Sequence, residues 1–190
     1  MYRAMTLKVL QQGIDIHDKH AIALLADKTE ISLEQRNNEL QVLLDNNDVT
    51  AAIRTQAVTK SVSAVSMVKE VRELMVRAQR KMSERGSIIV EGRDIGTVVF
   101  PHADLKFFMV ADVHKRAVRR HKELHQQGVD VSIEALVKEI HERDQKDSGR
   151  ELSPLRKSDD AIEIDTSNLS IEEQVNVIVQ KVEEIQQQHT

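Results

Sequence analysis

Two short apolar segments constrain the fold of this chain most strongly. Residues 87–90 and 105–111 are apolar but do not alternate between apolar and polar side chains, which is the pattern of a strand that is covered on both faces. A third segment, 161–165, also has strand character, and segments with helical spacing separate the second strand from the third. Because strands that alternate with helices form parallel sheets, the sequence predicts an α/β fold.

The remaining segments predict several helices and one hairpin. Alternation over 30–35 and an apolar run at 40–44, with 36–39 between them, predict a β-hairpin that a turn at 45–48 follows. Asp18 is a plausible N-cap for a helix over 18–27, and Ser170 with Glu173 has the spacing of a capping box. Apolar spacing predicts further helices over 1–12, 53–67, 68–85, 113–127, 132–147 and 170–187.

Composition argues against several classes of protein. The net charge of −4 argues against a dedicated nucleic-acid binder, and 2% aromatic residues are too few for a base-stacking surface. The chain has no cysteine for a disulfide or thiolate chemistry, no membrane-length apolar run and no signal-peptide core. His121 and His125 are four residues apart, but the cations around them argue against a metal site, and no serine lies in a nucleophile elbow. We expect a cytoplasmic protein that acts as a monomer, with no nucleic-acid or membrane partner and no metal ligand from the chain.

The loop after residues 87–90 has the residues of a binding site for a charged ligand. It reads Glu-Gly-Arg-Asp-Ile-Gly-Thr-Val-Val-Phe-Pro over 91–101, and ligands in α/β sheets bind beyond the carboxyl ends of strands. Arg93 offers a fixed fork of donors that suits phosphate. Asp94 offers acceptors that suit an amino group.

Two further charged groups each have two interpretations. Arg116, Arg119 and Arg120 share one side of a predicted helix; they form either a solvated basic face or a clamp on a polyphosphate. Arg143 and Asp147 are four residues apart, so they form either an ordinary helical salt bridge or part of a ligand site.

Four segments, taken together, resemble bacterial cytidylate kinases. They are Met-Tyr-Arg-Ala at 1–4, Ile-Arg-Thr-Gln at 53–56, the loop at 91–101, and Glu-Arg-Asp at 142–144 with Asp147 and Arg150. The resemblance implies one domain over 1–190 with a P-loop-kinase-like parallel sheet, a β-containing CMP-binding lobe at about 28–85 and a helical lid at about 113–157. It also implies transfer of the γ-phosphoryl group of ATP, with Mg²⁺, to CMP or dCMP in pyrimidine metabolism.

The resemblance also implies a role for each candidate residue. Cytosine presents an amino donor next to ring acceptors, so a carboxylate and an arginine can read it, and uracil reverses part of this pattern. The implied CMP contacts are Arg3 and Arg93 for the phosphate, Ser63, Arg72 and Asp94 for the base, Arg143 and Asp147 for the sugar, and Arg150 for the phosphate in the closed state. The implied ATP contacts are Arg116, Arg119 and Arg120, and the charge-stabilising residues are Arg116, Arg119 and Arg150.

One part of the family pattern is missing from this sequence. No Gly-Lys pair occurs in the 190 residues, so the Walker A loop that cradles ATP phosphates is not among them, nor is the strand before it. We expect a sequence whose start was placed too late, which an in-frame upstream phosphate loop would verify, and little kinase activity from the chain as written. The alternatives are a non-catalytic CMP-binding or regulatory protein and a helix-rich interaction protein without a ligand.

Overall fold

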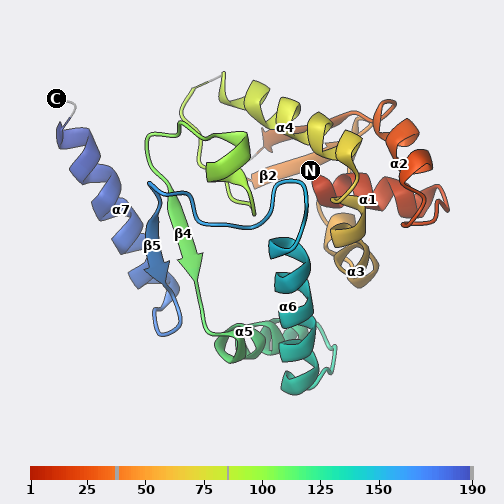
Figure 1. Ribbon diagram of the computed structural model, residues 1–190. Helices are drawn as coiled ribbons and strands as arrows, with labels where there is room; N and C mark the ends of the chain where they lie inside the picture. Colours follow the sequence, from red (N-terminus) through yellow and green to blue (C-terminus); the bar gives the residue numbers. More distant parts are fainter. Residues whose placement is uncertain (37–38, 85, 189–190) are drawn as a thin grey trace. The chain divides into compact units, whose positions relative to one another are not determined.

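The chain divides into two compact units, each of which contains its own packed elements. The computed structural model describes residues 1–36, 39–84 and 86–188 (Figure 1). The first unit is Met1–Glu91 with Arg150–Leu152, and the second is Gly92–Gly149 with Ser153–Thr190.

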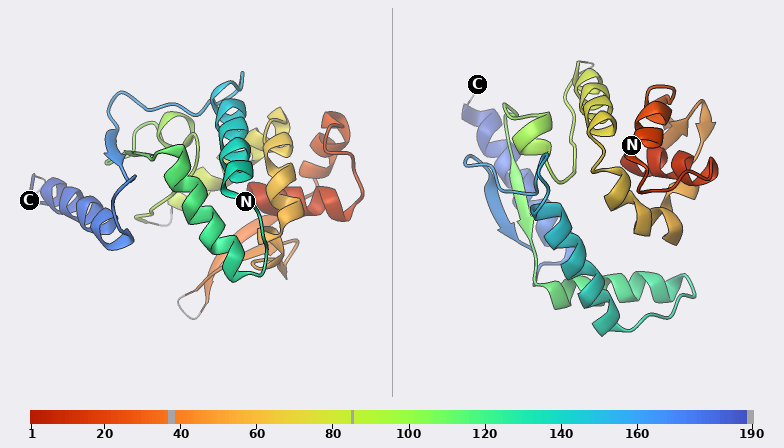
Figure 2. Two further views of the ribbon diagram at one scale, coloured as in Figure 1. Left: turned by 90° about the horizontal axis from the view of Figure 1, so that it is seen from below. Right: turned by 45° about the vertical axis from the view of Figure 1, so that its right-hand side comes forward.

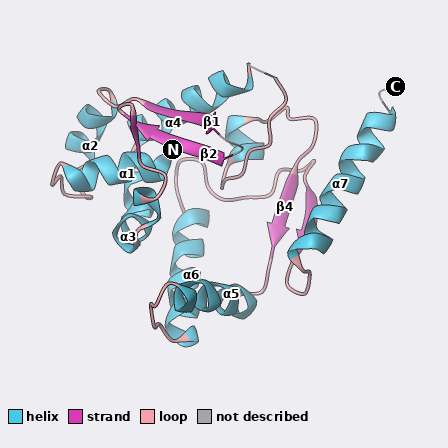
Figure 3. Ribbon diagram, turned by 180° about the vertical axis from the view of Figure 1, so that it is seen from behind, coloured by secondary structure: helices cyan, strands magenta, loops and turns pink. Residues whose placement is uncertain are grey.

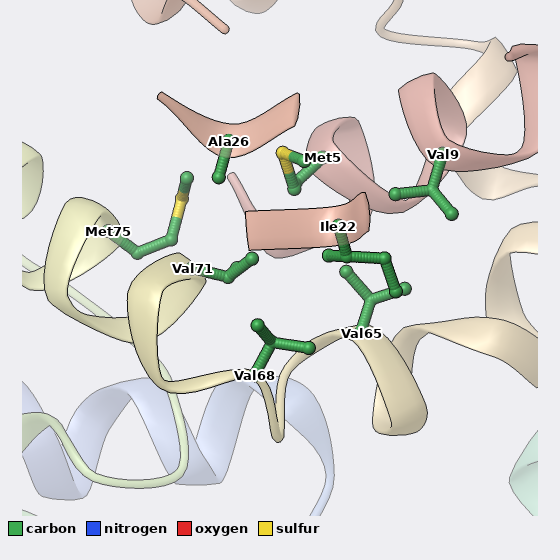
Figure 4. Packing of buried hydrophobic residues seen from close by; sticks show 8 residues of the cluster. All are labelled: Met5, Val9, Ile22, Ala26, Val65, Val68, Val71 and Met75. Carbon is green, nitrogen blue, oxygen red and sulfur yellow. The ribbon is translucent and has the colours of Figure 1, made fainter. Parts of the chain in front are cut away.

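The first unit consists of helices and a small antiparallel sheet. Apolar residues from four helices form its main core, in which Met5, Ile22 and Val71 are fully buried (Figure 4). The predicted cap of the second helix is confirmed, because the Asp18 carboxylate accepts from the amide of Ala21 at 2.9 Å. The elements are α1 (Tyr2–Gln11), α2 (Lys19–Ala26), β1 (Ile31–Arg36), β2 (Glu39–Leu44), β3 (Asn47–Asp48), the 3-10 turn η1 (Ala52–Arg54), α3 (Gln56–Val65) and α4 (Lys69–Ser83).

The predicted hairpin is confirmed. Strands β1 and β2 are antiparallel neighbours, with Ile31 opposite Leu44 (Figure 3). A tight turn leads the chain from β2 to β3, and its central residues, Asp45 and Asn46, have φ angles of 48° and 66°. Asn and Asp tolerate this left-handed conformation better than other residues with side chains, which explains why the sequence signal was reliable here. The predicted turn between β1 and β2 includes residues 37 and 38, which lie outside the described residues.

The second unit contains the parallel strand pair that the sequence predicts. Strand β4 pairs in parallel with β5, with Phe107 opposite Ile162 and Val110 opposite Asp165, and the two strands lie side by side in Figure 1. This pair confirms the predicted α/β class. The elements are the π-helical turn η2 (Ile95–Val99), β4 (Phe107–Val110), α5 (Val113–Gln126), α6 (Ile133–Ser148), β5 (Ile162–Asp165) and α7 (Ile171–Gln188).

The predicted strand at 87–90 is wrong. Residues 87–90 have no strand structure, and Ile88 and Ile89 are exposed rather than buried. An apolar run becomes a strand only where a neighbouring strand accepts its hydrogen bonds. In the described part of the chain, β4 and β5 pair with each other and neither pairs with this segment. The composition of residues 87–90 is therefore that of a strand, but no strand among the described residues pairs with the segment.

Helices α5 and α6 are consecutive and pack against each other within the second unit. They lie side by side in both views of Figure 2, and Ala117, Leu124 and Leu136 form the buried contact between them. The predicted capping box of α7 is confirmed, because Ser170 Oγ accepts from the amide of Glu173 and the Glu173 carboxylate accepts from the amide of Ser170. None of the described helices has the length and apolar character needed to cross a membrane.

Candidate functional site

In the second unit, one buried carboxylate joins two arginines of the predicted site. The side chain of Asp147, near the end of α6, is only 5% exposed, and its Oδ2 accepts from Nε of Arg93 at 2.9 Å. Nε of Arg143, one helical turn earlier, lies 3.8 Å from the same oxygen. The helical salt bridge expected from the spacing is therefore present, and it also anchors an arginine 54 residues away.

The two guanidinium groups around Asp147 repel each other. Burial is the main factor that lowers the pKa of Arg143 below its ordinary value, and the charge of Arg93 lowers it further, while Asp147 and Asp144 act in the opposite direction. A group of two cations around one buried anion carries a net positive charge. It is suited to hold a further anion, such as a phosphate, or the hydroxyls of a sugar.

Asp94 lies at the start of a tight π-helical turn rather than in an open loop. It is 5% exposed, and its carbonyl accepts from the amides of Val98 at 2.9 Å and Val99 at 3.2 Å. A Cβ atom at Gly92 would lie 2.9 Å from Cγ1 of Ile95. The glycine therefore lets the backbone pass close to the turn that carries Asp94.

The sequence analysis missed Lys106, whose side chain lies next to this turn. Its side chain is 6% exposed, and Nζ donates to the carbonyl of Pro101 at 2.5 Å and to the carboxylate of Asp160 at 2.6 Å. A Cβ atom at Gly96 would come within 3.2 Å of the Lys106 stem. This interaction holds the pKa of Asp160 below its ordinary value, mainly through the hydrogen bond from Lys106. A lysine within the apolar segment 105–111 was the available signal.

In the first unit, Arg3 is held by neighbouring elements. Its Nη1 donates to the carbonyl of Ile53 at 2.9 Å and to the hydroxyl of Thr59 at 3.0 Å. These contacts join two segments of the predicted family pattern, 1–4 and 53–56, within one unit. They orient a half-buried arginine, as a phosphate-binding role requires.

Ser63 and Arg72 are linked through Ser66. The Ser66 hydroxyl donates to the carbonyl of Ser63 at 2.9 Å, and the Ser66 carbonyl accepts from Nη1 of Arg72 at 3.2 Å. Arg72 is only 4% exposed, so its side chain lies in the interior of the first unit. Its guanidinium carbon lies 5.5 Å from the centre of the Tyr2 ring, a contact that no sequence pattern indicated.

The three arginines of α5 contact three different acceptors. Arg116 donates to both carboxylate oxygens of Asp144 on α6, at 3.2 and 2.5 Å. Arg119 donates to the carbonyl of Thr166, and Arg120 pairs with a glutamate on its own helix at 3.1 Å. Their common spacing therefore does not bring them to one point, and the predicted ATP contacts remain predictions.

The candidate residues are divided between the two units. Arg3, Ser63, Arg72 and the half-buried Arg150 belong to the first, and the others belong to the second. Arg150 follows Gly149, which ends α6. Among the residues that the structure describes, no group of three or more His, Asp or Glu side chains could hold a metal ion.

Comparisons with known proteins show the family to which the chain belongs. The family model for cytidylate kinase matches residues 1–184. The cytidylate kinase of Bacillus pumilus is 46% identical over 188 residues, which are 99% of this chain and 84% of that protein. Those of Bacillus subtilis and Clostridioides difficile are 44% and 43% identical, and the alignments cover 97% and 96% of this chain and 82% of each relative. The chain belongs to the cytidylate kinase family.

Proposed function

We propose that this protein transfers the γ-phosphoryl group of ATP to CMP or dCMP, which yields ADP with CDP or dCDP. The match of the cytidylate kinase family model over residues 1–184 is the observation that carries this proposal. The phosphate oxygen of CMP attacks the γ-phosphorus of ATP, and the bond from that phosphorus to the bridging oxygen of ADP breaks. Such a reaction depends chiefly on positioning and on charge neutralisation.

The proposed CMP contacts follow the chemistry of each group. The Arg93–Asp147–Arg143 cluster supplies donors for phosphate and acceptors for sugar hydroxyls. The carboxylate of Asp94 would accept from the cytosine amino group, and Arg72 would donate to the ring acceptors. We propose these contacts together with contacts from Arg3, Ser63 and Arg150. We also propose that residues at about 28–85 form a CMP-binding lobe and that residues at about 113–157 form a lid.

On the ATP side, the chain offers arginines but no glycine-lysine loop. We propose that Arg116, Arg119 and Arg120 bind ATP phosphates and that Arg116, Arg119 and Arg150 stabilise the charge that develops during transfer. Mg²⁺ neutralises phosphate charge in this class of reaction. We propose that Mg²⁺ enters as a complex with the phosphates of ATP.

We propose that the protein acts in the cytoplasm as a monomer, within pyrimidine nucleotide metabolism. Its substrates are nucleotides that a cell keeps inside its membrane, and ATP and CMP are the only partners that the reaction needs. Size-exclusion chromatography with light scattering checks the monomer, and a dimer would contradict it.

Calorimetric titration with CMP, dCMP and UMP tests the proposal. We expect cytosine nucleotides to bind more tightly than UMP, and Arg93→Ala to weaken CMP binding about 10- to 100-fold through loss of a charged hydrogen bond. Arg77→Ala, at an exposed position of α4, is the matched control and should change nothing. Equal affinity for all bases would overturn the proposal, and an unchanged Arg93→Ala variant would favour an interaction protein without a nucleotide ligand.

A coupled ADP-release assay separates the kinase from a non-catalytic CMP-binding protein. Because the 190 residues contain no Gly-Lys pair, we expect turnover below about 1 s⁻¹, the low end for kinases. Turnover at a normal kinase rate would contradict the weak activity that we propose for this chain. CMP binding with no turnover at any ATP concentration would favour the regulatory alternative.

A further inference from the structure

Arg72 has an unusual environment for an arginine. It lies in the first turn of α4, is only 4% exposed, and has Val68, Val71 and Met75 of the apolar core on the same short stretch of chain. Burying a guanidinium is unfavourable unless other groups replace the water that it loses. The contacts around this side chain therefore have to offset the free-energy cost of its burial.

Two of these contacts fix the guanidinium in different ways. The Tyr2 ring lies 5.5 Å from the guanidinium carbon, a distance at which an aromatic face attracts a cation. The Ser66 carbonyl accepts from Nη1 at 3.2 Å. The ring contact limits rotation of the guanidinium out of its plane, and the hydrogen bond limits rotation within the plane. Together they leave Arg72 with one preferred orientation.

Tyr2 itself is firmly placed. It is the first residue of α1 and packs against the main core of the first unit. Its carbonyl accepts from the hydroxyl of Thr6, a fully buried residue, at 2.9 Å. Because the core fixes the position of the ring, the ring gives the guanidinium of Arg72 a fixed face to contact.

We propose that Tyr2 is a positioning residue that sets the selectivity for cytosine over uracil by fixing the orientation of Arg72. The inference rests on the proposed function, in which Arg72 donates to the ring acceptors of cytosine. An arginine that can turn freely can donate to the carbonyl acceptors of either base, whereas an arginine with a fixed orientation faces the N–H donor that uracil carries where cytosine has a ring acceptor. Ser66 extends the same framework to Ser63, the other base-reading residue of this unit.

The first experiment measures the ratio of CMP to UMP affinity by calorimetry for Tyr2→Leu and Tyr2→Phe. We expect Tyr2→Leu to lower the ratio about 2- to 30-fold, the range that corresponds to loss of a cation–π contact, and Tyr2→Phe to keep it. Leu7→Ala is the control, because Leu7 lies on the same helix but packs against another cluster. It should lower thermal stability and leave the ratio unchanged.

The second experiment covers the case in which Tyr2→Leu does not fold. Tyr2 is the only tyrosine of the chain, so biosynthetic replacement with 3-fluorotyrosine alters this ring alone. Fluorine weakens the negative face of the ring with little change in its size. We expect a lower CMP-to-UMP ratio at unchanged thermal stability.

Each outcome supports or overturns the inference. A ratio that falls in Tyr2→Leu or with fluorotyrosine, but not in Leu7→Ala, supports it. A cytosine preference that survives both changes at Tyr2 overturns this inference and leaves the proposed function intact. No cytosine preference in the unmodified protein overturns the proposed function, and this inference falls with it.

Discussion

Replacing Asp147 with asparagine isolates the charge at the centre of the second unit's cluster. The substitution keeps the size of the side chain and one acceptor oxygen but removes the negative charge between Arg93 and Arg143. A hydrogen bond to a charged group contributes about 1.5–3 kcal/mol. Because Arg93 is 44% exposed, solvent screening reduces this to roughly 1–2 kcal/mol. We expect Asp147→Asn to destabilise α6 by that amount.

Native-state hydrogen exchange of the α6 amides is the suitable assay. Exchange reports the opening of one helix within its own unit, whereas urea unfolding reports the loss of a whole cooperative unit. A loss of roughly 1–2 kcal/mol accelerates exchange about 5- to 30-fold. The matched control is Glu142→Gln on the same helix, which removes an exposed pair with Lys138 whose atoms lie 4.0 Å apart. It should change exchange little.

A double-mutant cycle with Arg93→Gln completes this test. If Asp147 acts through Arg93, the effects of the two substitutions will not add, and the coupling between them will be about 0.5–3 kcal/mol. Two results would refute the reasoning. One is an Asp147→Asn variant that exchanges like Glu142→Gln, and the other is strict additivity with Arg93→Gln.

Three further predictions concern stability. Burial raises the pKa of Asp45, but hydrogen bonds, chiefly from Lys8, lower it by more, so its pKa lies below the ordinary value. The ionised carboxylate therefore stabilises the folded state. This stabilisation is complete above the ordinary pKa and is lost as pH falls through the lower pKa of the folded state. Urea unfolding between about pH 6 and pH 3 should show a smaller acid loss for Asp45→Asn, and an equal loss would contradict this. Ile22→Ala, at a fully buried site, should cost about 2–5 kcal/mol in urea unfolding, against little for Leu24→Ala on the same helix, where the side chain is 53% exposed; similar costs would contradict the assigned core. Ser170→Ala should cost about 1 kcal/mol and speed exchange in the first turn of α7, and unchanged exchange there would show that the cap contributes nothing.

The sequence predicted the parts of the fold that depend on local chemistry. The hairpin, the cap at Asp18 and the capping box at Ser170 follow from side chains that act within a few residues of their own position. The strand at 87–90 depended on a neighbour, and exposed Ile89 shows what happens to a strand-forming segment that no described strand pairs with. Local pattern alone cannot supply a partner strand.

In the candidate site, too, the sequence predicted the local contacts but not the contacts between distant residues. Spacing predicted that Arg143 and Asp147 share a helix face, and they do. The link from Asp147 to Arg93 spans 54 residues, and no periodic pattern reports contacts over that separation. The burial of Arg72 and Lys106 was not predicted either, because charged side chains are usually exposed and a local pattern gives no sign of the exceptions.

The division of the chain has a practical consequence for anyone who wishes to study the units separately. The backbone passes from one unit to the other three times, after Glu91, Gly149 and Leu152. A fragment that begins at Gly92 would carry the tripeptide Arg150–Leu152 away from the unit to which it belongs. A fragment that ends at Glu91 would lack it, so no single cut yields both units whole.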